Sequence, residues 1–264
     1  MGRRTLMRFS ANLGLLWPDR PLLARIESAA RAGFRAVEMH WPYDVPAGEV
    51  LEAARLNDLT LLGINTAPGR FDAGERGLGA IPGRERDFQA TVDQAIDYCR
   101  ASGSIAIHAM AGNVAVGERA RARGVFAENL RVAAAKAAAH HLVLLLEPLN
   151  PFDNPGYFYS TLADAVSLID ELRLPNLKLQ FDVYHVARSE GDVLAKLERY
   201  RQHIGNVQIA GVPARAEPDE GEIAYPAIFA ALDKLRYDGW IGCEYRPRGD
   251  TDRGLTWMTR MGLR

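Results

Sequence analysis

Short apolar segments alternate with longer amphipathic ones along the whole chain. Eight of the short segments are apolar enough to be strands buried on both faces, and a helix-like pattern follows each of them. Parallel strands need helical crossovers, and eight strand–helix units close into a barrel. We therefore predict a single (β/α)8 TIM barrel domain over residues 1–264, a length close to the roughly 250 residues typical of this fold.

Local signals support the boundaries of these units. Gly33 is placed to end the first helix in a left-handed conformation, and Thr161 is placed to cap the fifth. An open, doubly wound sheet is the alternative, but "SANLGLLW" lacks the glycine-rich phosphate turn that usually follows its first strand. The predicted strands are 7–13, 36–41, 60–66, 105–110, 142–149, 177–184, 206–211 and 240–245. The predicted helices are 21–32, 49–57, 85–101, 118–140, 162–172, 193–200, 225–235 and 253–262.

The composition argues against nucleic acid or a membrane as a partner. The 32 basic and 33 acidic residues give a formal net charge of −1, so no general field attracts a phosphate backbone or an anionic bilayer. No apolar run approaches the ~20 residues that span a membrane, and residues 1–6 are basic without the apolar core of a signal peptide. We expect a cytoplasmic protein in which Cys99 and Cys243 are reduced, buried thiols.

Four polar residues close the last four predicted strands. They are Glu147, Asp182, Gln208 and Glu244. The carboxyl ends of the strands meet at one mouth of a barrel, so these side chains are expected to converge. Three carboxylates in a cleft of low dielectric constant require protons or a cation to offset their charge. The set predicts a divalent metal ion, Mg²⁺ or Mn²⁺, because all of its donor atoms are oxygens.

The two glutamates also suit proton transfer. A small substrate that lies between Glu147 and Glu244 can exchange a proton with either carboxylate. The alternative for each glutamate, taken singly, is a purely structural role. In that role the carboxylate at the strand end accepts a hydrogen bond from an amide of a nearby loop.

Other polar residues close the first four strands. They are Asn12, His40, Asn65 and His108. Each is placed to line the floor of the pocket, and Asn12 and His108 are taken as candidates for substrate binding. The alternative for each is that it satisfies backbone groups near the strand end.

Four further candidates for substrate binding belong to loops. His185 is expected on the loop after the sixth strand, where it could donate a hydrogen bond to a substrate oxygen. Arg215 follows the seventh strand, and its planar fork suits a substrate carboxylate. Arg70 and Glu75 belong to a long third loop, and such loops often cover active sites. For all four, a solvated loop side chain is the alternative.

Longer motifs are more specific than these single residues. They are "AGERGLGAIPGRE", "HAMAGN", "LEPLNPFDNPGYF", "DVYH", "VQIAGVPARAEPDEGEI" and "GCEYRPRGDT", and together they extend over nearly the whole chain. On these segments the chain resembles the hydroxypyruvate isomerase family, within the xylose isomerase-like TIM barrel superfamily.

The resemblance implies an isomerase of the aldose–ketose type. Such an enzyme interconverts hydroxypyruvate and 2-hydroxy-3-oxopropanoate by moving a proton between adjacent carbons through a cis-enediolate. The matching residues imply that Glu147 and Glu244 form the acid–base pair, and that these two with Asp182 and Gln208 hold the metal. Related sugar epimerases have histidine at the position of Gln208, so the amide favours this family.

The resemblance also bears on the choice of substrate. His185 and Arg215 match positions that contact substrate in relatives. Two departures lie at the same end of the site: residues 69–71 read Gly-Arg-Phe where the family usually has Gly-Asp-Trp, and Ala187 stands where glutamine is common. Both departures affect the substrate assignment more than the type of reaction.

Several other functions stay open. A 2-oxo-tetronate isomerase, or an epimerase of a larger keto-sugar, would use the same two carboxylates. An endonuclease acting on abasic DNA uses the same superfamily barrel with several zinc ions and many histidines, whereas this chain has six histidines. A barrel that binds a sugar acid without converting it is a further alternative. The oligomeric state, including a homo-oligomer, is open.

Overall fold

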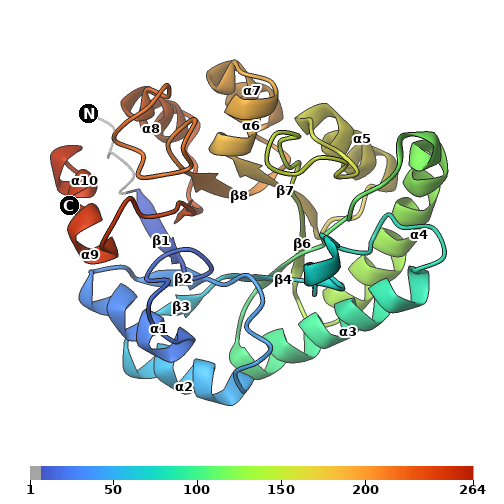
Figure 1. The fold of residues 1–264 in the computed structure, drawn as a ribbon, viewed down its shortest axis with the longest axis horizontal. Coiled ribbons are helices and arrows are strands. Elements are labelled where there is room, and N and C mark those ends of the chain that lie inside the picture. Colours follow the sequence, from blue (N-terminus) through green and yellow to red (C-terminus); the bar gives the residue numbers. More distant parts are fainter. Residues whose placement is uncertain (1–6, 264) are drawn as a thin grey trace.

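The computed structural model describes residues 7–263. Residues 1–6, for which we expected no signal peptide, lie outside this part. The strands stand at the centre and the helices surround them (Figure 1). The strands are β1 (Arg8–Asn12), β2 (Ala36–Glu38), β3 (Thr60–Leu61), β4 (Gly63–Asn65), β5 (Ala106–His108), β6 (Val143–Leu146), β7 (Leu177–Asp182), β8 (Ile204–Ile209) and β9 (Trp240–Cys243). The helices are α1 (Leu22–Arg31), α2 (Ala47–Leu56), α3 (Glu85–Ser102), α4 (Arg119–Ala138), α5 (Leu162–Leu172), α6 (Val183–Ser189), α7 (Val193–Tyr200), α8 (Tyr225–Lys234), α9 (Thr251–Gly254) and α10 (Thr256–Arg260), with short 3₁₀ turns at Phe71–Ala73 and Val116–Glu118.

The strands form one parallel sheet that closes on itself. Their order is β3-β2-β1-β9-β8-β7-β6-β5-β4. The two end strands, β3 and β4, are halves of one predicted strand that is interrupted at Leu62. The amide of Leu62 donates to the carbonyl of Val37, and the amide of Met39 donates to the carbonyl of Gly63, both at 2.9 Å. The predicted barrel is therefore confirmed, and the open doubly wound sheet is wrong.

The structure also bears out two predicted helix ends. Gly33 follows Ala32, the C-cap of α1, and has a φ of 86°, a conformation that favours glycine. The side chain of Thr161 accepts a hydrogen bond from the amide of Asp164 at 3.2 Å and so caps α5. The last predicted helix, 253–262, is instead two short helices, α9 and α10.

Several predicted strands end earlier in the structure than expected, and one of these differences changes the site. The strand expected over 177–184 ends at Asp182, and α6 begins at the next residue. Asp182 Oδ1 accepts a hydrogen bond from the amide of Tyr184 at 2.8 Å, so the residue that ends the strand also caps the helix. His185, which we expected on a loop, therefore lies in the first turn of α6.

The interior of the barrel is more polar than the branched apolar filling that dominates most barrels of this type. Glu38, Gln180 and Asn206 line a cavity of about 390 Å³ that extends from Trp240 at the base to His108 at the strand ends. Between residues 7 and 263, no helix is both long enough and apolar enough to cross a bilayer.

Candidate active site

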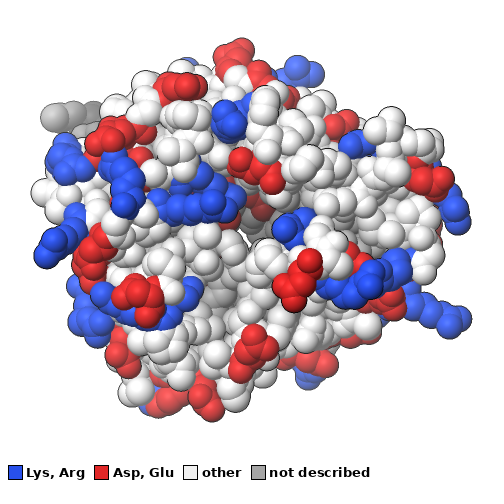
Figure 2. Space-filling model, viewed as in Figure 1, with Lys and Arg blue, Asp and Glu red and all other residues white. Residues whose placement is uncertain are grey.

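Four polar side chains lie at the carboxyl ends of neighbouring strands. Glu147 follows β6, Asp182 ends β7, Gln208 is the penultimate residue of β8, and Glu244 follows β9. The strand register pairs Asp182 with Gln208. All four are buried, with at most 5 % of their surface exposed. Figure 2 shows a hollow near the centre of the face it presents, with acidic and basic side chains beside it.

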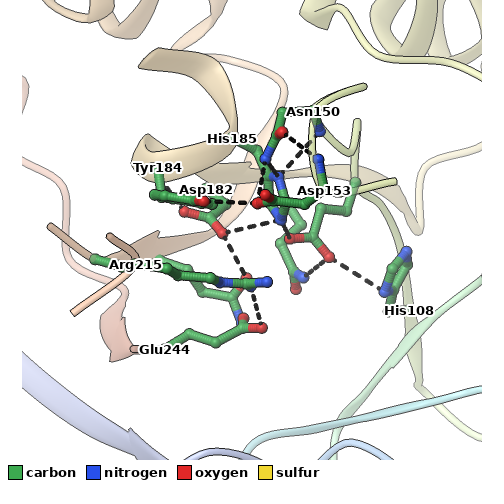
Figure 3. Close-up of polar contacts among 12 residues, drawn as sticks. His108, Asn150, Asp153, Asp182, Tyr184, His185, Arg215 and Glu244 are labelled. Carbon is green, nitrogen blue, oxygen red and sulfur yellow. Dashed lines mark hydrogen bonds and ion pairs between the residues drawn. The ribbon is translucent and has the colours of Figure 1, made fainter. Parts of the chain in front are cut away.

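Close contacts link the two glutamates. His185 Nε2 lies 4.0 Å from Glu147 Oε1 and 3.6 Å from Asp182 Oδ2. Arg215 Nη2 lies 3.7 Å from the same Asp182 oxygen and 2.8 Å from Glu244 Oε1. The Arg215 guanidinium is thus placed between Asp182 and Glu244 (Figure 3). The structure brings these five side chains into one cluster.

Three oxygens of the four strand-end side chains are buried without a hydrogen-bond partner. They are Oε1 of Glu147, Oδ2 of Asp182 and Oε1 of Gln208. Leaving a buried polar atom unpaired typically costs about 1–3 kcal/mol, so such atoms usually face a ligand, an ion or water. The other polar atom of each side chain is bound within the protein at 2.7–2.8 Å: Glu147 Oε2 by Gln180, Asp182 Oδ1 by the Tyr184 amide and Gln208 Nε2 by Glu38. A set of spare oxygens like this one fits a hard divalent cation.

His185 stands beside these oxygens as a hydrogen-bond donor. Its Nδ1 lies 3.0 Å from the backbone nitrogen of Asn150, which can only donate, so Nδ1 accepts and carries no hydrogen. Burial, aided by the charge of Arg215, lowers the pKa of His185 to about 3, and the ring is neutral with its hydrogen on Nε2. His185 lies within metal-ligating distance of Glu147 and Asp182. In this tautomer, however, it offers them an N–H and not a lone pair.

Glu147 and Asp182 lie where a protonated carboxyl is favoured. Burial, followed by the charges of Glu244 and Asp182, raises the pKa of Glu147 well above its usual range. Burial also raises the pKa of Asp182 to about 7, against the opposing effect of Arg215. In the metal-free protein, burial thus favours the neutral form of both groups, and a proton on either one would reduce the charge that three carboxylates bring together.

Glu244 lies in the opposite environment. Burial favours the neutral form, but Arg215, assisted by a hydrogen bond from His40, outweighs burial and lowers the pKa of Glu244 to about 2. His40 Nε2 lies 3.1 Å from Glu244 Oε1, the same oxygen that Arg215 contacts. Two glutamates that both follow strands therefore have pKa values that are shifted in opposite directions.

His108 and Asn12 lie on the floor of this cluster, where both line the barrel cavity. His108 Nδ1 is 3.3 Å from Glu147 Oε2, and burial lowers the pKa of His108 to about 4, so the ring is neutral. Asn12 is buried at the end of β1, and its Oδ1 accepts from the amide of Gly14 at 2.9 Å.

Arg70 and Glu75 form a separate cluster in the third loop. Glu75 accepts from the backbone amide of Arg70 at 2.6 Å and from the side chain of Arg84 at 3.0 Å. The Arg70 amide, with the two guanidinium groups, lowers the pKa of Glu75 to about 2. The side chain of Arg70 is 77 % exposed. Across residues 7–263, no hydrogen bond or ion pair joins these two residues to the strand-end cluster.

Three buried residues that we did not single out from the sequence support the cluster. Glu38 and Gln180 hold Gln208 and Glu147, and Asn150 sets the tautomer of His185. Glu38 and Gln180 do have a signal, because each interrupts the apolar run of a strand buried on both faces, where a polar side chain needs a partner.

Comparisons with known proteins agree with this geometry. A family model described as xylose isomerase-like TIM barrel matches residues 26–261. A 2-oxo-tetronate isomerase of Cupriavidus necator is 48 % identical, with 95 % of this chain and 97 % of that protein covered. A hydroxypyruvate isomerase of Escherichia coli K12 is 41 % identical, with 96 % of this chain and 98 % of that protein covered. A crystal structure described as an AP endonuclease, family 2, from Brucella melitensis has a TM-score of 0.94 and 42 % identity, with 96 % of this chain and 98 % of that structure's chain covered.

These matches confirm the resemblance seen in the sequence motifs, because they extend over nearly the whole chain at well above 30 % identity. The chain belongs to the xylose isomerase-like TIM barrel family, and within it to the isomerases whose curated relatives are named for hydroxypyruvate and 2-oxo-tetronate.

Proposed function

We propose that the chain isomerises a small hydroxy-keto acid, with hydroxypyruvate and 2-hydroxy-3-oxopropanoate as its substrate pair. The observation that carries this proposal is the pair of buried glutamates, Glu147 and Glu244, connected through Asp182 and Arg215 at one mouth of the barrel. The relative of 41 % identity bears the name hydroxypyruvate isomerase.

The two glutamates move the proton between carbons. A proton leaves C3 of hydroxypyruvate and passes to one glutamate, which gives a cis-enediolate. The partner glutamate supplies a proton to C2, while the hydroxyl hydrogen moves from O3 to O2. Positioned acid–base groups of this kind contribute about 10²–10⁴-fold to the rate.

We also propose that Glu147, Asp182, Gln208 and Glu244 hold a divalent ion, Mg²⁺ or Mn²⁺. The support is the three spare buried oxygens, which an ion would satisfy. The bound ion would stabilise the negative charge of the enediolate.

Arg215 and His185 are proposed to bind the substrate. The guanidinium of Arg215 packs 5.2 Å from the centre of the Tyr184 ring, which fixes its fork toward the cluster. It would pair with the substrate carboxylate. The Nε2–H of His185 would donate to a substrate oxygen.

A 2-oxo-tetronate isomerase is the second candidate, favoured by the relative of 48 % identity that carries this name. Proton NMR in deuterated water, with the three-carbon acid, the four-carbon acid and a neutral keto-sugar in separate samples, distinguishes the candidates. We expect deuterium at the reacting carbon of hydroxypyruvate. Faster exchange into the four-carbon acid would reassign the substrate. No exchange into either acid would refute the proposed activity.

An endonuclease is not proposed, although a related crystal structure carries that description. In the part of the chain that the structure describes, the grouped metal-ligating side chains are Glu147, Asp182 and His185, and His185 acts there as a donor. A cytoplasmic location is also a proposal, which the buried thiols of Cys99 and Cys243 suit.

A further inference from the structure

The amide of Gln208 has two chemically opposite ends. Only its carbonyl oxygen can bind a cation, because the NH₂ group is a donor without a lone pair to offer. In the structure Nε2 donates to Glu38 Oε2 at 2.7 Å, while Oε1 is buried without a partner. Gln208 pairs in register with Asp182 on the neighbouring strand, so both side chains belong to the same face of the sheet. The orientation of this amide therefore decides whether the cluster has three spare oxygens or only two.

Glu38 is itself held firmly. It is buried on β2, and its Oε1 accepts a hydrogen bond from the hydroxyl of Ser10 at 2.6 Å. The neighbouring strand makes room for the pair, because a Cβ atom at Gly242 would lie 2.4 Å from Glu38 Oε1 and 2.9 Å from Gln208 Cγ. Glycine at position 242 thus allows Glu38 and Gln208 to meet inside the barrel.

We propose that Glu38 is a positioning residue that fixes the amide of Gln208 with its carbonyl oxygen toward the cation site. An ionised carboxylate only accepts hydrogen bonds, so Glu38 can pair with the NH₂ end of Gln208 but not with its oxygen. This inference rests on the metal-binding part of the proposed function, because Glu38 would act only by orienting Gln208, which is one of the proposed metal ligands.

A change of one atom in Glu38 reverses this preference. In Glu38→Gln, the new amide keeps the Ser10 hydrogen bond by accepting through its own oxygen, which leaves its NH₂ group facing Gln208. Gln208 satisfies that donor only by turning its carbonyl oxygen inward and its NH₂ group toward the cation site. The opposite arrangement leaves the Ser10 hydroxyl hydrogen without an acceptor, which is costly in a buried position.

The decisive variant exchanges the two residues. In Glu38→Gln/Gln208→Glu, the amide at position 38 still accepts from Ser10 and donates to the carboxylate at position 208. The second oxygen of that carboxylate then faces the cation site, and the formal charge of the pair is unchanged.

The experiment is calorimetric titration of Mn²⁺ into metal-free protein, without substrate. We expect Glu38→Gln to bind Mn²⁺ about 10–100-fold more weakly than the wild type, the range usual for loss of a group that orients a ligand. We expect the exchanged pair to recover affinity to within about threefold of the wild type or better. Ser10→Ala is the matched control, because it removes a hydrogen bond to Glu38 but leaves the acceptor that orients Gln208, and we expect a change below about threefold.

Denaturant unfolding of the metal-free variants separates orientation from folding. A structural role alone would weaken Mn²⁺ binding only in proportion to lost folding, and would not be rescued by the exchange. Glu38→Gln binding within twofold of a wild type that binds Mn²⁺ would overturn this inference alone, as would failure of the exchanged pair to bind better than Glu38→Gln. A wild type that binds no Mn²⁺ would overturn both this inference and the proposed metal site.

Discussion

The two sides of the strand-end cluster hold the same type of residue in opposite surroundings. Glu147 is packed beside the neutral imidazole of His108 and the amide of Gln180, and burial raises the pKa of Glu147 well above its usual range. Glu244 accepts from Arg215, and its pKa is lowered to about 2 despite burial. Both residues directly follow a strand of the same sheet. The residue type and the position after a strand are the same for both, so the neighbouring side chains cause the difference between their pKa values.

This difference suits the roles that we propose for the two glutamates, a proton donor and a proton acceptor at one barrel mouth. Pairs of carboxyl groups whose environments push their pKa values apart are typical of acid–base sites. Asp182 stands between the two sides, in contact with both His185 and Arg215. The experiments that follow remove or reverse the contrast between the two sides.

The largest effect is expected from removing either carboxylate. Glu147→Gln and Glu244→Gln should each slow deuterium exchange at the substrate carbon by about 10²–10⁴-fold, because in the proposed mechanism each glutamate handles one proton. Glu244→Gln should also raise KM, since it removes the partner of Arg215. Steady-state kinetics and NMR exchange in deuterated water measure both quantities.

The surface variant Glu171→Gln is a suitable control, because Glu171 pairs with Arg123 away from the cluster. It should leave both quantities unchanged. If either Glu147→Gln or Glu244→Gln exchanged at the wild-type rate, the mechanism would need one carboxylate and not two.

A smaller effect is expected from removing the cation on the Glu244 side. Arg215→Met should raise KM by about 10–100-fold, the range for a lost hydrogen bond to a charged group. It should also move the acid limb of the kcat/KM profile to higher pH. Without Arg215, burial dominates and raises the pKa of Glu244, so Glu244 gains its proton at a higher pH as the solution is acidified.

The pH profile of Arg215→Lys is the control for charge. Lysine keeps the positive charge but not the planar fork, so its acid limb should stay closer to that of the wild type. An unchanged acid limb in Arg215→Met would show that Arg215 does not set the protonation of Glu244.

The smallest effect is expected on the pH dependence of metal binding. Protons compete with the cation on Glu147 and on Asp182, whose pKa is about 7, so Mn²⁺ affinity should rise with pH near neutrality. The rise should be up to about tenfold per pH unit for each proton displaced. Glu244 contributes nothing to this slope, because its pKa of about 2 leaves it ionised throughout.

Calorimetry in two buffers with different heats of ionisation counts the protons released. Glu147→Gln should release fewer protons than the wild type. Equal release by both proteins would mean that Glu147 is already ionised before the metal binds, which would remove the contrast between the two glutamates.

Periodicity and strand ends were enough to predict the barrel and the location of its polar mouth. The reason is geometric, since parallel strands must point the same way and their carboxyl ends must meet. Glu147 and Glu244 stand out because each follows an apolar run. The same reasoning missed Glu38, because the predicted strand 36–41 continues past it, whereas β2 ends at Glu38. Its partner, Gln208, is 170 residues away in the chain.

The helix that carries His185 was missed for a different reason. At seven residues, α6 is too short to show a helical period, and it follows β7 without a turn. Its start depends on the capping hydrogen bond that Asp182 Oδ1 accepts from the amide of Tyr184, which only the structure shows. The tautomer of His185 likewise depends on Asn150, a contact across 35 residues of sequence.

The bonds that hold the four strand-end side chains also set how many ligand atoms each can supply. Glu147, Asp182 and Gln208 each have one polar atom bound within the protein, and Glu244 meets both Arg215 and His40 through a single oxygen. Each residue is therefore limited to one-point coordination, and together they supply four donors to the ion that we propose. Mg²⁺ and Mn²⁺ prefer about six oxygens. Two coordination positions would remain, which equals the number of adjacent oxygens in a hydroxy-keto group.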